Sequence, residues 1–307
     1  MSPAPIPSGK AGASLLPRTS LGPVTIRVAD SARSARFYRD VLGFQAAPGS
    51  DGLTALGAGG SPVVLLKQVP GARAVRPASG LFHFAILVPT RAALGQALRR
   101  LAESQVGIGQ ADHLVSEALY LADPDGNGIE IYRDRPRSQW RWNQGTVEMA
   151  TEPLDLESLL HEGDRDPSQK ETLPFETRIG HVHLQVADVE QATGFYHDAV
   201  GFDVTARWQG AAFLSAGGYH HHLGLNSWAS RGAPPAPADS TGLESFVIRV
   251  PEAQDLSALA ARLEAAGSPV RREDGTVRAR DPWNVEVQFT RQGDPPEAAG
   301  SPTIPPR

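Results

Sequence analysis

The chain contains an internal repeat, and this repeat constrains its fold more than any other feature. Residues 22–44, GPVTIRVADSARSARFYRDVLGF, align without a gap with residues 180–202, GHVHLQVADVEQATGFYHDAVGF, at an offset of 158 positions. The same offset brings the Gly-Gly pair at 59–60 onto the pair at 217–218. Self-similarity at a fixed period is typical of folds built from copies of one supersecondary unit. We therefore expect the two halves of the chain to share one architecture.

A second, weaker repeat lies within each half. Residues 80–89, GLFHFAILVP, resemble residues 242–251, GLESFVIRVP, and an Ala/Leu-rich stretch follows both. Each half then reaches an Asp-Pro turn, at Asp123 and Asp281. Alternating segments such as HVHLQV place residues i and i+2 on one face, which predicts an opening strand for each unit. The sequence thus predicts four units of roughly fifty residues, each with a strand, a short helix and two or three further strands.

Segments of different composition flank and separate these units. Residues 1–20 and 292–307 are rich in Pro, Gly and other small residues, so we expect flexible tails there. Residues 21–135 and 178–291 hold two units each, and residues 136–177 form a linker that is longer than ordinary connections. A duplication of this kind either enlarges a core or builds a cavity between paired units.

The composition excludes several classes of function. The net charge of −5 argues against a nucleic acid partner, which would need a basic face. The absence of cysteine excludes disulfides, thiolate catalysis and cysteine-ligated metals. No apolar run is long enough for a membrane span, and the first residues lack the apolar core of a signal peptide. We therefore expect a cytoplasmic protein with no membrane partner.

One position of the opening strand carries histidine in two of the four units. This position, five residues before the Val that ends the strand, holds Pro23, His83, His181 and Ser245 in units one to four. A single histidine is more often structural than functional. Equivalent placement in two repeats favours His83 and His181 as metal ligands.

A carboxylate in the last strand of unit two supplies a third candidate. Glu130 lies between Ile129 and Ile131, and a buried, unpaired carboxylate is costly. A metal is one explanation, and an edge strand with Glu130 facing water is the alternative. In unit four we take Glu286 as the matching carboxylate, but Ser245 stands where the histidine would be.

These positions predict how the units pair. If units two and three form one cavity, they bring His83, His181 and Glu130 together. Two histidines and one carboxylate are the facial triad of non-haem Fe(II) oxygenases, which leaves positions open for substrate and O₂. Units one and four would then form a second cavity without a metal.

The repeated V-A-D…F-Y-x-D-x-x-G-F motif, together with LYLADPDGNGIEIY, resembles the vicinal oxygen chelate superfamily. The resemblance covers residues 22 to about 290. Across ADHLVSEALYLADPDGNGIEIYRDRP, IGHVHLQV and YHHHLGLNSW it is greatest to the bacterial four-module catechol 2,3-dioxygenase group. It implies an α+β fold of four βαβββ modules that form two open mixed-sheet barrels.

The resemblance also implies an activity. It is Fe(II)-dependent extradiol cleavage of catechol or a substituted catechol with O₂, and Mn(II) is the alternative metal. The partners would be a catecholic small molecule and O₂. A homo-oligomer is possible, and the sequence does not decide the oligomeric state. By the same resemblance, His221, Tyr120 and His113 would be catalytic, with His221 as the acid–base residue. His183 and His222 would bind substrate.

His221 belongs to the run of three histidines that precedes Leu223. If the run is part of a strand, alternation places Tyr219, His221 and Leu223 on one face and His220 and His222 on the other. Three surface histidines in a loop are the alternative. Which histidine faces the site therefore stays open.

Two other functions compete with ring cleavage. A glyoxalase-like enzyme would use Ni²⁺ or Zn²⁺ and typically a second carboxylate, which the matched positions lack, and it would leave His221 unexplained. A metal-free binding protein, in the manner of bleomycin resistance proteins, would leave the three candidate ligands without partners. A fold alone cannot choose between these functions.

Overall fold

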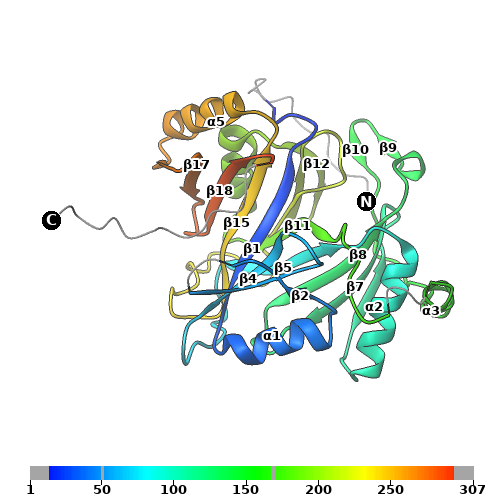
Figure 1. The fold of residues 1–307 in the computed structure, drawn as a ribbon. Coiled ribbons are helices and arrows are strands. Elements are labelled where there is room, and N and C mark those ends of the chain that lie inside the picture. The colour runs from blue at the N-terminus through cyan, green and yellow to red at the C-terminus, as the bar shows by residue number, and fades with distance from the viewer. Residues whose placement is uncertain (1–13, 50–51, 167–169, 294–307) are drawn as a thin grey trace.

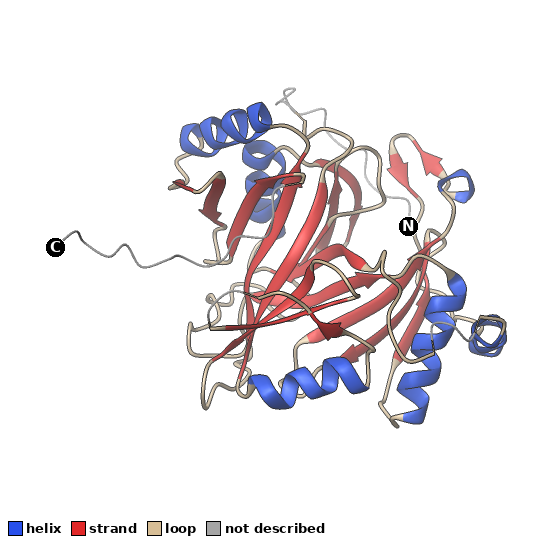
Figure 2. Cartoon of the chain, viewed as in Figure 1, coloured by secondary structure: helices blue, strands red, loops and turns tan. Residues whose placement is uncertain are grey.

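The computed structural model of the protein describes residues 14–49, 52–166 and 170–293 (Figure 1). Residues 1–13 and 294–307, the larger parts of the two predicted tails, lie outside the described residues. Two mixed sheets of eight strands each dominate the described chain, and few helices accompany them (Figure 2). The predicted α+β fold of repeated modules, arranged as two open mixed sheets, is confirmed.

The first sheet combines units one and four. Its strands, in spatial order, are β16 (Arg271–Glu273), β17 (Thr276–Arg280), β18 (Glu286–Arg291), β15 (Gly242–Val250), β1 (Ser20–Val28), β4 (Pro62–Gln68), β3 (Leu53–Gly57) and β2 (Gln45–Ala46). The antiparallel pair β1–β15 joins the two units at the centre.

The second sheet combines units two and three. Its order is β12 (Asp203–Trp208), β13 (Ala211–Ser215), β14 (Leu223–Asn226), β11 (Arg178–Gln185), β5 (Gly80–Leu87), β8 (Gly128–Asp134), β7 (Ser116–Ala122) and β6 (Gly109–Asp112). The antiparallel pair β5–β11 joins these units, and each of its strands has a parallel neighbour, β8 and β14 respectively. This is the pairing that the candidate ligands predicted.

Helices pack on both sheets. They are α1 (Ser31–Asp40), α2 (Arg91–Glu103), α3 (Leu156–Asp164), α4 (Val189–Thr193), a π-helical segment (Gly194–Val200) and α5 (Ala253–Ala265). A short 3₁₀ turn (Arg137–Gln139) and the strands β9 (Trp142–Asn143) and β10 (Thr146–Val147) belong to the linker, as does α3. Side chains of Asp30, Thr90, Asp155 and Asp188 accept hydrogen bonds from first-turn N–H groups, which explains where α1 to α4 begin.

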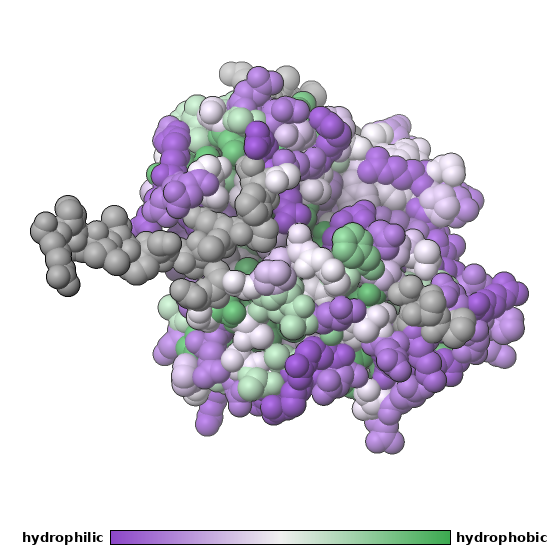
Figure 3. Space-filling model, viewed as in Figure 1, coloured by the Kyte–Doolittle hydropathy of each residue, from purple (hydrophilic) through white to green (hydrophobic). Residues whose placement is uncertain are grey.

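The two sheets share one hydrophobic core. Apolar side chains of the central strands β1 and β11, among them Ile26 and Val182, belong to the same buried cluster. The described surface seen in Figure 3 is mainly hydrophilic, with hydrophobic residues in small separate patches. None of the described helices is both long and apolar enough to cross a membrane.

The repeated motifs also join the sheets. The Tyr38 hydroxyl of unit one donates to Asp123 in the Asp-Pro turn of unit two, at 3.2 Å. The Tyr196 hydroxyl of unit three donates to Asp281 of unit four in the same way, at 3.1 Å. Burial raises the pKa of Asp281 to about 6. The repeated tyrosine and the Asp-Pro turn therefore have a structural role, because they connect unit one with unit two and unit three with unit four across the two sheets.

Candidate metal centre

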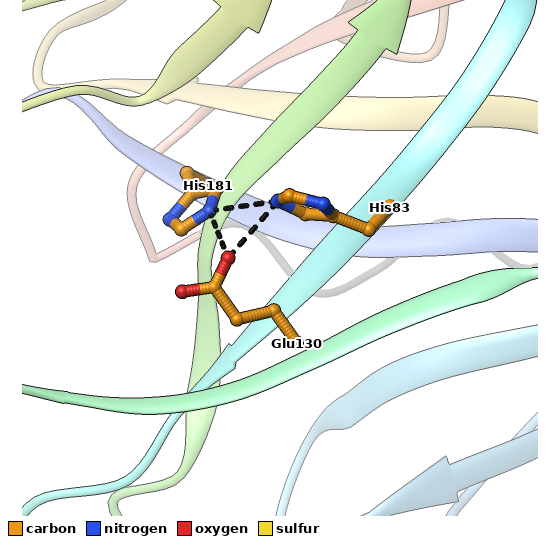
Figure 4. A group of neighbouring side chains, drawn as sticks. All are labelled: His83, Glu130 and His181. Atoms are coloured by element: carbon orange, nitrogen blue, oxygen red, sulfur yellow. Dashed lines mark hydrogen bonds and ion pairs between the residues drawn. The ribbon is translucent and has the colours of Figure 1, made fainter. Parts of the chain in front are cut away.

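His83, His181 and Glu130 converge at the centre of the second sheet (Figure 4). The Nε2 atoms of the two histidines are 3.3 Å apart, and each lies 3.0 Å from Oε2 of Glu130. All three side chains are buried. The alternative in which Glu130 faces water on an edge strand is therefore wrong.

The strand register explains this convergence. In the antiparallel pair β5–β11, His181 lies opposite Ala85 and His183 lies opposite His83. The two units are thus related by an approximate two-fold axis, which gives His83 and His181 equivalent places. On the parallel neighbour β8, Glu130 pairs with Ala85 and so lies beside both rings.

Electrostatics favour the protonation states that bind metals. Burial alone would raise the pKa of Glu130, but His181 and His83 together hold it well below its ordinary value. Burial lowers the pKa of His181 to about 4, although Glu130 opposes this shift. Near neutral pH the carboxyl group is therefore ionised and the His181 imidazole neutral, which are the forms that metal ions require.

The geometry fits a metal ion. Ligand atoms about 2.1 Å from one ion and at right angles to one another would lie about 3.0 Å apart, close to the separations seen here. Without a cation, both imidazoles would have to carry their hydrogen on Nε2 to satisfy one carboxylate oxygen, with the two nitrogens only 3.3 Å apart. Within the described part of the chain, no fourth His, Cys, Asp or Glu joins this group.

A cavity of about 350 Å³ opens onto the three side chains. Its volume falls within the usual range for small-molecule sites, at the lower end. Apolar and aromatic side chains make up much of its wall. Besides the three candidate ligands, the lining residues are Phe82, Gly109, Gln110, Ala111, His113, Val115, Ser116, Tyr120, Met149, Thr151, His183, Trp208, Phe213, His221 and Trp228.

Tyr120 and His113 form a connected pair in this wall. His113 Nδ1 is 2.6 Å from the carbonyl oxygen of Ala150, which can only accept a hydrogen bond. In neutral His113, Nε2 is therefore the acceptor, and the Tyr120 hydroxyl donates to it over 2.7 Å. Burial raises the pKa of Tyr120 well above its ordinary value, and the neighbouring Glu130 adds to this. Tyr120 thus keeps its proton near neutral pH.

His183 also faces the cavity, from the same strand face as His181. Its Nε2 accepts a hydrogen bond of 3.0 Å from the Asn226 side-chain amide. Burial lowers the pKa of His183 well below its ordinary value, so the ring is neutral. A neutral ring held by Asn226 can pack against an aromatic ligand.

The run of three histidines does not form part of a strand, which corrects the predicted alternation. β14 begins only at Leu223, and the run lies in the connection that leads to it from β13. All three rings are buried, so they are not surface histidines either. Only His221 lines the cavity, with its ring centroid 4.1 Å from that of His181.

His222 does not reach the cavity, contrary to the substrate-binding position expected for it. Its Nδ1 accepts a hydrogen bond of 3.2 Å from the backbone N–H of Ala216, and its ring packs against Phe202 and Tyr219. Because the connection turns sharply here, successive side chains point in unrelated directions rather than to two alternating faces.

Sequence reasoning missed most of the cavity wall. Phe82 directly precedes His83 on β5, and this position could have indicated a place in the cavity wall, but Phe82 was not singled out. Trp208 and Trp228 lie in unit three with His181 and His221, and Trp228 ends the quoted YHHHLGLNSW stretch, but neither was singled out. Met149 and Thr151 come from the linker, whose irregular backbone has no periodicity that could have revealed them.

Comparison with known proteins agrees with this geometry. Residues 20–131 and 178–289 match the family model described as the Glyoxalase/Bleomycin resistance protein/Dioxygenase superfamily. The chain belongs to this superfamily. The resemblance noted in the sequence is thereby confirmed.

Among relatives in the superfamily, the catechol-2,3-dioxygenase of Bacillus subtilis strain 168 is 45% identical over 270 residues, or 86% of this chain and 94% of that protein. A solved structure from the same species, described as a proposed dioxygenase, has a TM-score of 0.63 at 14% identity and covers 92% of this chain and 87% of its own. Glyoxalase I from Zea mays has a TM-score of 0.52 at 17% identity, covering 89% and 92%. At such low identities the two structures support the fold alone.

The approximate two-fold axis identifies the counterpart of Glu130 in unit three. Gly224 on β14 pairs with His183 as Glu130 on β8 pairs with Ala85. A Cβ atom at Gly224 would lie only 2.7 Å from the His183 ring. Where a glyoxalase-like member of the superfamily would need a second carboxylate, this chain has the imidazole of His183 instead.

The equivalent place in the first sheet also differs from the sequence expectation. Phe246 pairs with Val287 in the first sheet, as Phe84 pairs with Ile129 in the second. Glu130 directly follows Ile129, and Gln288 directly follows Val287. The counterpart of Glu130 is therefore Gln288 rather than Glu286. Gln288 Nε2 donates to Ser245 Oγ at 3.4 Å. Glu286 instead forms ion pairs with arginines. The error was two positions, which alternation cannot detect because residues i and i+2 share a face.

Proposed function

We propose that this chain is an extradiol dioxygenase that uses Fe(II), with Mn(II) as the alternative, to open catechol or a substituted catechol with O₂. One observation carries the proposal. The three ligand atoms converge beside a cavity whose wall also holds a neutral histidine, His221, and a protonated tyrosine, Tyr120. The catechol-2,3-dioxygenase relative supports the same reaction class.

The residues of the wall can serve the chemistry as follows. A bound metal would hold the diol and O₂ side by side at its open positions. His221, whose pKa burial lowers well below its ordinary value, is neutral and can accept the proton of a substrate hydroxyl. The Tyr120 hydroxyl, which donates its hydrogen to His113, can accept a hydrogen bond from a substrate hydroxyl. The surrounding aromatic rings can pack against the substrate ring and hold it in place.

The cavity also favours a class of catechol. Phe82, Trp208 and Trp228 contribute aromatic surface, and no Lys or Arg is among the described residues that line it. A carboxylate substituent would be buried near ionised Glu130 without a counter-ion, which is costly. We therefore infer that neutral, apolar ring substituents are preferred over acidic ones.

The test is oxygen uptake by the Fe(II)-loaded protein with catechol. We expect no reaction under argon, and on admission of air we expect stoichiometric O₂ consumption with formation of a coloured semialdehyde. 4-Methylcatechol should be at least about tenfold better in kcat/KM than 3,4-dihydroxybenzoate, since leaving a buried charge unpaired costs more than 1.4 kcal/mol. No O₂ uptake with any catechol, combined with O₂-independent glyoxalase-type isomerisation by the Ni²⁺- or Zn²⁺-loaded protein, would contradict the proposal.

A further inference from the structure

The His221 ring has one nitrogen bound within the protein. Its Nδ1 lies 2.8 Å from Nδ1 of His220, the preceding residue. Among the contacts of the described residues, this is the hydrogen bond that the ring makes. Nε2 is therefore the nitrogen that remains for the cavity.

The chain of contacts continues beyond His220. Its Nε2 lies 2.8 Å from Oδ1 of Asp134, at the end of β8. The Tyr219 hydroxyl donates to the same carboxylate at 2.9 Å. His220 is fully buried, whereas the Asp134 side chain is 25% exposed. A carboxylate at the protein surface is thus connected through one buried imidazole to a ring in the cavity wall.

The chemistry of these groups decides where the protons lie. An ionised carboxylate only accepts hydrogen bonds, so His220 Nε2 carries a hydrogen and donates it to Asp134. In its neutral form His220 has only this one N–H, so its Nδ1 is then an acceptor. His221 must then donate from Nδ1, and its Nε2 is left with a free lone pair.

We propose that Asp134 and His220 are positioning residues that hold His221 with its unprotonated Nε2 toward the cavity. Neither touches the substrate site: Asp134 and His220 are absent from the described cavity lining. The catalytic consequence rests on the proposed function, because a proton acceptor beside the diol is useful only if the diol is the substrate. The inference also gives a role to His220, the first histidine of the run.

Two substitutions at His220 separate positioning from packing. The side-chain amide of Asn reaches about as far as Nδ1 of histidine, so His220→Asn keeps an acceptor for His221, whereas His220→Leu removes it. We expect kcat of His220→Leu to fall about 10–100-fold with KM and bound iron nearly unchanged, and His220→Asn to recover most of the loss. Asp134→Ala should resemble His220→Leu. Equal kcat values for the two His220 variants would overturn the inference.

A control variant tests whether the loss of any carboxylate that is paired with a histidine lowers kcat. Asp198 lies 3.9 Å from His197 on an exposed part of the π-helical segment. Asp198→Asn should keep the wild-type kcat. If it lowers kcat as much as Asp134→Ala does, the effect is not specific and the inference fails.

Nitrogen NMR tests the inference independently of turnover. Zn²⁺ is diamagnetic, so the ring nitrogens of ¹⁵N-histidine-labelled, zinc-substituted protein can be assigned. We expect His221 to carry its proton on Nδ1 in the wild type, and to become a mixture of both forms in His220→Leu. A proton on Nε2 in the wild type would refute the inference even if catechol is cleaved. Failure to cleave catechol, with the proton on Nδ1, would refute the proposed function alone.

Discussion

His221 and His83 lie close together in the cavity wall, but their environments suit different tasks. Nε2 of His83 points at Nε2 of His181 and at Glu130. The His221 ring is tilted against the His181 ring and is hydrogen-bonded to His220. The two histidines thus differ in the atoms that their ring nitrogens contact, although both rings lie near His181. Substitution at each residue should therefore have a different primary effect.

Loss of His83 should remove the metal, and loss of His221 should remove turnover. We expect His83→Ala to bind little iron after dialysis, because only two of three ligands remain. His221→Ala should retain about one iron per chain, while kcat falls about 10²–10⁴-fold, the usual loss for a positioned acid or base. Iron content and kcat measured on the same preparations check both. Near-normal turnover by His221→Ala would contradict its acid–base role.

His222 allows a prediction about pH. Burial lowers its pKa to about 3, from an ordinary value of about 6.5. The unfolded chain therefore binds one more proton at this residue between these values, and stability falls as pH decreases from about 6.5 toward 3. Removing the group should flatten the slope by up to about 1.4 kcal/mol per pH unit.

Urea unfolding of the wild type and His222→Asn at pH 7.5 and pH 5 measures this difference. Asn can keep an acceptor for the Ala216 N–H. The variant should lose less stability than the wild type over that interval. Parallel losses in the two proteins would show that His222 is not held neutral by burial.

Among the elements, the linker helix α3 is fixed to α2 by a close approach of two glycines. A Cβ atom on Gly95 of α2 would lie 2.3 Å from the carbonyl oxygen of Leu159 and 2.8 Å from the backbone nitrogen of Gly163. Backbone atoms cannot move aside as flexible side chains do. This contact anchors the linker, whose earlier residues Met149 and Thr151 line the cavity.

Gly95→Ala should therefore destabilise the protein, although the same change inside a free helix would stabilise it by about 1 kcal/mol. We expect a loss of about 1–3 kcal/mol in urea unfolding, the usual range for overpacking. Gly194→Ala is the control, since the nearest atom to its added Cβ is the Asp198 carboxylate at 3.8 Å. Stabilisation by Gly95→Ala would mean that the helices do not pack this closely.

For the whole molecule, the two sheets are alike in topology and unlike in chemistry. Pro23, Ser245 and Gln288 occupy the places that His181, His83 and Glu130 hold in the other sheet. None of the three former side chains is a strong ligand for a divalent metal. The first sheet thus repeats the topology of the second sheet but not its candidate metal site.

The metal content should accordingly be one per chain. We expect elemental analysis of the loaded protein to give about one iron, and Ser245→Ala to leave that number unchanged. Glu130→Gln should reduce it toward zero. A stoichiometry near two would contradict the assignment of the first sheet as free of metal.

The sequence predicted the parts of this molecule that repeat. His83 and His181 were recognisable because two copies of one strand carry histidine at the same position, and the pairing of units followed from them. The strand placement of His221 was wrong because its run lies in an irregular connection, where alternation does not apply. The contribution of Asp134 had no sequence signal, since it depends on a contact between residues 86 positions apart.

The placement of β1 has a consequence for synthesis of the chain. β1 finds β4 soon after it is made, but its other neighbour, β15, begins roughly two hundred residues later, which at 5–20 residues per second means roughly 10–40 seconds. The units of the second sheet are complete by Asn226, before β15 exists. At that point the nascent chain contains every strand of the candidate metal site, while β1 still has an open edge. During that interval the open edge of β1 can pair with another chain, and the charged Arg27 on this strand opposes such pairing.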